Sequence, residues 1–147
     1  MTLSKRRGLF VNYEINPSNR YIKKQEFIWR DLKLDSVDSD IYALVLNLGH
    51  YCGTYTDLMR ITGIKSLASI QKRINRMVED EVLAKRQVPI SGTMIRAVLA
   101  ACYSEIGKRE DWEVEQDLDI GQEELTRYYM ERRYINLMRQ QEGRKKL

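Results

Sequence analysis

Residues 54–77, TYTDLMRITGIKSLASIQKRINRM, constrain the fold more than any other part of the chain. Thr54 and Asp57 have the spacing of a capping box, in which each side chain bonds the backbone amide of the other residue at a helix start. They predict a helix that begins at Thr54 or two residues later and ends at Gly63, because glycine tolerates the positive φ of a sharp turn. A further helix is predicted to begin near Ser66. The stretch therefore reads as two short helices joined by a tight turn.

The second of these helices has an apolar side and a cationic side. Its apolar residues fall within a stripe about 100° wide, which is typical of a helix that packs on a core. They are Leu67, Ile70, Ile74, Met77 and Val78. The opposite side carries Lys65, Lys72 and Arg76, with Arg73 on its flank, and no acid appears before Glu79. A solvated surface is the simpler interpretation, but an exclusively cationic face favours contact with DNA.

The flanking sequence places this pair of helices between another helix and a hairpin. Residues 35–40, DSVDSD, are rich in N-cap residues, and an amphipathic helix is predicted to follow them and to end near Gly49. Residues 82–90, VLAKRQVPI, suit a strand, and the SGT that follows suits a turn. This order of elements is that of a winged helix-turn-helix. The predicted DNA contacts are Lys65, Ser66, Ser69, Lys72, Arg73, Arg76, Lys85 and Arg86.

The stretch from about Phe27 to Ile90 resembles the winged helix domains of plasmid and phage replication proteins and their small regulatory relatives. The resemblance is carried by FIWRDLKLDSVDSDIYALVLNLGHYCGTYTDLMRITGIKSLASIQKRINRMVEDEVLAKR, somewhat under half of the chain. It implies a protein that binds double-stranded DNA, as a regulator or accessory factor of mobile-element replication, transfer or transcription.

The N-terminal residues predict a strand and a basic arm. Residues 9–15, LFVNYEI, alternate with period two and indicate a strand. Lys5, Arg6 and Arg7 precede it and suit either a DNA-binding arm or a soluble tail.

The second half of the chain is predicted to be helical. Residues 93–111 have apolar side chains at helical spacing, which favours a helix over the return strand of a hairpin. A long amphipathic helix is predicted around Leu125, Tyr128 and Tyr129. The fold class is thus mainly α, a winged helix-turn-helix with a short N-terminal β element and C-terminal helices. Residues 1–90 form one unit and residues 91–147 a helical region, which packs or dimerises. The alternative is a second helix-turn-helix, giving an internal pseudo-dimer.

Charge is segregated along the chain. The net charge is +4, yet residues 110–124 hold eight acids and no base, and residues 132–147 hold six bases and one acid. Separated charges create local fields that steer partners. The acidic segment therefore suits a basic protein partner, and the alternative function is a protein–protein adaptor that uses a winged helix fold without reading DNA.

Metal and enzyme signals are weak in the sequence. His50 is the only histidine, and Cys52 and Cys102 form no CxxC pair, so a His50/Cys52 metal site would need two further ligands from elsewhere. We expect reduced thiols, no metal and no cofactor. The sequence has no phosphate-binding loop and no GxSxG motif, so we expect no enzyme. The longest apolar run, residues 41–46, is too short to span a membrane, and we expect a cytoplasmic location.

Overall fold

The computed structural model describes residues 25–146, without the side chains of residues 144–146. The predicted N-terminal strand and the arm Lys5, Arg6 and Arg7 lie outside these residues. The described part consists of five helices and two antiparallel pairs of strands. The elements are α3 (Glu26–Arg30), α4 (Ser36–Leu48), α5 (Tyr55–Thr62), α6 (Leu67–Glu79), β1 (Leu83–Ser91), β2 (Met94–Ala101), β3 (Tyr103–Ser104), β4 (Gly107–Lys108) and α7 (Asp111–Lys146).

Local capping signals fix the helix starts, as the sequence predicts. The Asp35 side chain accepts a hydrogen bond from the backbone N–H of Asp38 at the start of α4. Thr54 and Asp57 form a complete capping box at the start of α5. Gly63 ends α5 in the left-handed conformation with a φ of 80°, and Ser66 caps α6. The predicted pair of short helices with a tight turn is therefore confirmed.

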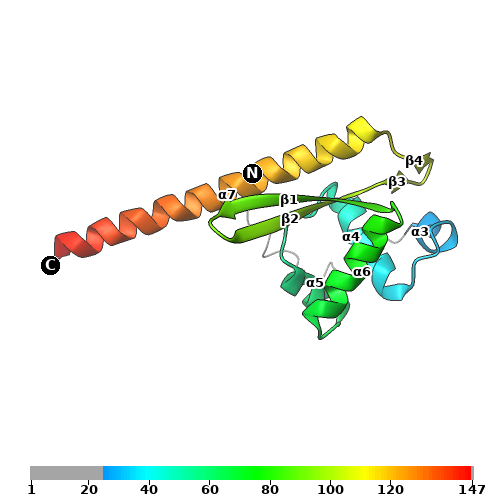
Figure 1. The fold of residues 1–147 in the computed structure, drawn as a ribbon, viewed down its shortest axis with the longest axis horizontal. Coiled ribbons are helices and arrows are strands. Elements are labelled where there is room, and N and C mark those ends of the chain that lie inside the picture. The colour runs from blue at the N-terminus through cyan, green and yellow to red at the C-terminus, as the bar shows by residue number, and fades with distance from the viewer. Residues whose placement is uncertain (1–24, 147) are drawn as a thin grey trace.

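The hairpin of β1 and β2 has a hydrophobic core on each of its faces. Successive side chains of a strand point to opposite faces. Leu83, Leu99 and Ala101 belong to a core with the helices α3 to α6. Val88 and Val98 belong to a second core with Leu118 and Leu125 of α7. The molecule therefore has three layers, with the hairpin between the helical body and α7 (Figure 1).

Helix α7 continues well beyond the body of the molecule (Figure 1). It has 36 residues, which corresponds to a length of about 54 Å. Its buried residues, such as Val114 and Leu125, lie in the first half of the helix, whereas residues 132–143 are all exposed. No described helix is long and apolar enough to cross a membrane.

Two expectations for the second half are wrong. Residues 94–101 form the strand β2, whereas a helix was expected there. Residues 98–101 show no strand-like alternation because they are buried on both faces of β2. One face packs against α7 and the other against the helical body, and a strand buried on both faces has a continuous apolar sequence. The second helix-turn-helix is also absent from residues 91–146, because a single helix spans residues 111–146.

Candidate nucleic-acid interface

The outer side of α6 presents only part of the predicted cationic face to solvent. Lys65 and Lys72 are exposed. Ser66 is the N-cap, and its side-chain oxygen accepts a hydrogen bond from the backbone N–H of Ser69 at 3.2 Å. Ser66 is therefore exposed and caps the helix, whereas Ser69 in the first turn is half-buried.

Arg73 and Arg76 are engaged by acids of another helix. The Arg73 guanidinium lies 2.9 Å from Asp35 and 3.0 Å from Asp38, and that of Arg76 lies 3.1 Å from Asp38. The Asp38 side chain is only 5% exposed. The expectation of an exclusively cationic face is therefore wrong in part. Residues 65–78 contain no acid, but acids from the cap and first turn of α4 neutralise Arg73 and Arg76.

Lys85 and Arg86 lie on opposite faces of the hairpin. Lys85 Nζ donates to Asn75 Oδ1 of α6 at 3.1 Å. Arg86 faces α7, where it pairs with Glu115 and Asp119 and donates to Gln122 at 3.0 Å. Lys85 therefore stands beside α6, whereas Arg86 fastens α7 to the sheet.

A hollow of about 420 Å³ lies between the start of α5, α6 and the hairpin. Its polar side chains include Gln71 and Asn75 of α6 and Lys85 and Gln87 of β1. Amides that both donate and accept hydrogen bonds are suited to base edges, and Asn or Gln can bond adenine through two bonds. The sequence prediction missed these two α6 amides, although their i, i+4 spacing marks one helix face.

A second hollow of about 730 Å³ adjoins the first, since Thr54 and Arg96 line both. Four arginines line it together with one carboxylate, that of Asp57, which pairs with Arg60. The arginines are Arg60, Arg96, Arg132 and Arg133. Arg96 Nε donates to Tyr129 Oη at 3.0 Å, and the Arg132 guanidinium lies 5.5 Å from the centre of the Tyr128 ring. The two hollows form a continuous surface from α6 to α7, and its charged residues are cations with the exception of Asp57.

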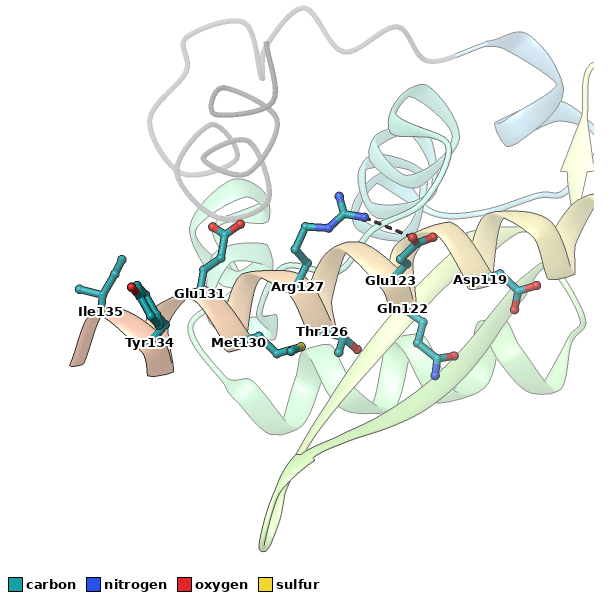
Figure 2. Close-up of a pocket in the computed structure, with 9 residues that line it drawn as sticks. All are labelled: Asp119, Gln122, Glu123, Thr126, Arg127, Met130, Glu131, Tyr134 and Ile135. Atoms are coloured by element: carbon teal, nitrogen blue, oxygen red, sulfur yellow. Dashed lines mark hydrogen bonds and ion pairs between the residues drawn. The ribbon is translucent and has the colours of Figure 1, made fainter. Parts of the chain in front are cut away.

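The outer face of α7 carries a further hollow, whose described lining residues all belong to this helix (Figure 2). Glu123 and Arg127 form an ion pair of 3.2 Å within it. Met130 and Tyr134 follow along the helix and are exposed. This face is opposite the one that packs on the hairpin.

A cluster of metal-ligating residues lies under α7. His50, Cys52 and Glu124 bring a ring nitrogen, a sulfur and a carboxylate oxygen within 4.8 Å of one another. Burial raises the pKa of the Cys52 thiol. The sequence indicated only His50 and Cys52, because nothing in it shows that α7 brings a residue from 74 positions further along the chain.

No protein-family model matches the chain, and no curated protein matches it.

Proposed function

We propose that the chain is a double-stranded DNA-binding protein with a winged helix-turn-helix. In this proposal α5, the turn at Gly63 and α6 are the helix-turn-helix, and the β1–β2 hairpin is the wing. The observation that supports it best is the continuous hollow surface that joins α6, the hairpin and α7, lined by five cations and one carboxylate.

Helix α6 would enter the major groove. An α-helix with its side chains is about 10–12 Å across, and the major groove is about 12 Å wide. Gln71 and Asn75 would contact base edges, while Lys65 and Lys72 at the exposed side would contact phosphates. Ser66 and Ser69, at the start of α6, would contact the sugar-phosphate backbone of the DNA.

The other residues that the sequence predicts to contact DNA have different roles in this proposal. Lys85 would contact a phosphate beside the groove, because it lies next to α6. Arg73 and Arg76 would reach DNA only in exchange for their ion pairs with Asp35 and Asp38. Arg86 would act through the position of α7.

Two copies would bind through the outer face of α7. Ile135 lies about 60° outside the stripe, but the other six exposed large apolar residues of α7 fall within about 100° of one another at 100° per residue. They are Trp112, Ile120, Met130, Tyr134, Leu137 and Met138. An antiparallel pair of α7 helices centred at position 125 would place Trp112 against Met138, Ile120 against Met130, and Glu123 against Arg127, each twice by two-fold symmetry. The acidic first half of each helix would then face the basic second half of its partner.

The biological setting, as a regulator or accessory factor of a mobile element, rests on the resemblance in the sequence. The alternative function is a protein–protein adaptor, which the exposed apolar side chains of α7 favour. Several acids of the 110–124 segment are committed within the chain: Glu115 and Asp119 to Arg86, and Asp117 to Arg109. The segment therefore offers a basic partner less charge than its composition indicates.

The proposal is tested by titrating a labelled random duplex with the full chain at several salt concentrations. We expect binding at low salt and a linear fall of log affinity with log salt concentration, because each phosphate contact releases counterions. The variant with Lys65, Lys72 and Lys85 replaced by Ala should bind more weakly and with a smaller slope. A control with Lys33→Ala and Lys108→Ala removes exposed cations that lie neither beside α6 nor in either hollow, and it should bind like the wild type. Binding that is absent at low salt, or equal in both variants, would favour the adaptor.

A further inference from the structure

We propose that His50, Cys52 and Glu124 form a binding site for a divalent transition metal, with Zn²⁺ as the best match. One nitrogen, one sulfur and one oxygen donor lie within 4.8 Å of one another. His50 Nε2 and Glu124 Oε2 already approach to 3.0 Å. Cys52 is fully buried, and the side chains of His50 and Glu124 are only 14% and 26% exposed, so all three donors lie mostly inside the protein.

The backbone directs the first two donors to the same side. Tyr51 is bridged to Leu99, with both backbone hydrogen bonds at 2.8 Å, so the segment is extended there. Side chains on either side of an extended residue point the same way, and His50 and Cys52 therefore both face α7. The site is held at the edge of the hairpin by main-chain bonds.

Helix α7 supplies the third donor and the room for the first. Glu124 follows Gly121 by three residues, so the two share a face of the helix. A Cβ at position 121 would lie 3.1 Å from Cδ2 of His50, closer than an ordinary contact. The missing side chain at Gly121 therefore lets the imidazole lie against the helix within reach of Glu124.

The donor set selects the class of ion. Calcium and magnesium prefer oxygen ligands alone, whereas zinc accepts nitrogen, sulfur and oxygen together. Zinc lies about 2.0–2.3 Å from such donors, which places neighbouring donors of a tetrahedral ion roughly 3.5 Å apart. The three donor atoms, which lie within 4.8 Å of one another, would approach to this spacing when the ion binds. On binding, the Cys52 thiol releases its proton to solvent, each of the three residues donates one electron pair, and water fills the fourth position.

A bound ion would fasten α7 to the segment that leads into α5. Glu124 belongs to α7, while His50 and Cys52 precede the capping residue Thr54 by only a few positions. An ion that binds the folded chain also stabilises it. The proposal stands independently of DNA binding, because its test measures only the ion and the chain.

The test titrates the reduced full chain with Co²⁺ and records the near-ultraviolet charge-transfer band of a cobalt–thiolate bond. The sequence makes the result specific, because it has one histidine and two cysteines. We expect the band to saturate at one ion per chain, to disappear when Zn²⁺ is added, to persist in Cys102→Ser and to be lost in Cys52→Ser. No band in the wild type, a band that depends on Cys102, or saturation at one ion per two chains would overturn the proposal.

A second pair of variants covers the case in which Cys52→Ser does not fold. Glu124→Gln keeps an oxygen acceptor beside His50 but removes the anionic ligand, whereas Glu123→Gln makes the same change at the neighbouring exposed position. We expect Glu124→Gln to lower the Co²⁺ affinity at least roughly tenfold, because even residues that only hydrogen-bond to metal ligands lower the affinity by this factor when they are replaced. Glu123→Gln should leave the affinity unchanged. Equal affinities in these two variants would contradict the site.

Discussion

Lys85 and Arg86 are neighbours in β1 but serve opposite faces of the hairpin, since Lys85 donates to Asn75 of α6 and Arg86 pairs with Glu115 and Asp119 of α7. Alternation along a strand thus assigns one cation to the proposed DNA surface and the next to the internal structure.

Alanine at each position should separate these two roles. Lys85→Ala should weaken DNA binding on every sequence and reduce the salt slope by about 1, with little change in the melting temperature. Arg86→Ala should leave the salt slope unchanged and lower the free energy of unfolding by up to about 1 kcal/mol, because its carboxylate partners are exposed. Salt titrations and thermal melts of both variants measure this. Equal losses of affinity in the two variants would place Arg86 on DNA as well.

The ion pairs of Asp38 predict that the α6 arginines matter for stability. Asp38 is buried, and Arg73 and Arg76 are its cationic partners. Replacing both by Ala should lower the free energy of unfolding by about 3 kcal/mol, the lower end for a broken buried pair because Arg76 is half exposed. Lys72→Ala, on the same helix, should change it by less than about 0.5 kcal/mol. Adding Asp38→Asn to the double variant should recover part of the loss, and a double variant that melts like the wild type would contradict the network.

Asp35 should make the stability of the folded protein depend on pH in the acidic range. A hydrogen bond from the Asp38 backbone amide and the pairing with Arg73 hold the pKa of Asp35 below its ordinary value. A carboxyl group with a depressed folded pKa contributes stability above its unfolded pKa of about 3.9 and loses it as the pH falls through the folded pKa.

Asp35→Asn keeps an oxygen that caps α4 and removes only the charge. The wild type should therefore be the more stable protein at pH 7, and the difference should shrink as the pH falls from about 5 to about 2. Denaturant melts across this range measure the difference. A difference that stays constant with pH would mean that the Asp35 charge adds nothing to stability.

Two glycines of α7 form a matched pair for the contact of this helix with the body. A Cβ at Gly121 would collide with Val98 and crowd His50, whereas Gly143 has nothing within 4 Å. Alanine favours a helix over glycine by about 1 kcal/mol. Gly143→Ala should thus leave stability unchanged or raise it by up to about 1 kcal/mol, while Gly121→Ala should lower it, since the steric clash outweighs the gain in propensity. Thermal melts that rank the two variants in the opposite order would show that α7 does not lie this close to the hairpin.

The sequence predicts those parts of the fold that local signals determine. The capping box at Thr54 and the glycine at position 63 act within a few residues, and both are confirmed. The apolar stripe of α6 is confirmed in part, since Ile70, Ile74 and Met77 are buried whereas Leu67 is 44% exposed. The strand β2 was missed because its pattern depends on burial by α7, which lies further along the chain. Local sequence does not encode which layers cover a strand.

In the candidate sites, too, local sequence predicts some features while others depend on how the helices pack. The exposure of Lys72 follows from the helix phase alone, and Lys65 lies in the turn just before the N-cap of α6. The pairing of Arg73 with Asp35 joins residues 38 positions apart, and that of His50 with Glu124 joins residues 74 apart. Such contacts depend on how the helices pack, so the neutralised part of the α6 face and the metal-ligating cluster emerge only in three dimensions.

The proposed antiparallel pairing of α7 predicts a charge-reversal pattern. In the dimer, Glu123 of each copy faces Arg127 of the other. Glu123→Arg alone or Arg127→Glu alone would place like charges together at two symmetric positions, and each should shift the chain towards the monomer. The double variant restores opposite charges and should restore the dimer.

Light scattering of the full chain at low salt, over a range of concentrations, measures the association. Within one chain the same two residues also form an i, i+4 ion pair, whose loss affects the helix by only about 0.3–0.5 kcal/mol. Melts of the single variants at concentrations below association control for that effect. Tyr134→Glu should also prevent association, because it places a charge within the apolar stripe. A wild-type chain that remains monomeric at high concentration, or single variants that associate as well as the double variant, would rule out this interface.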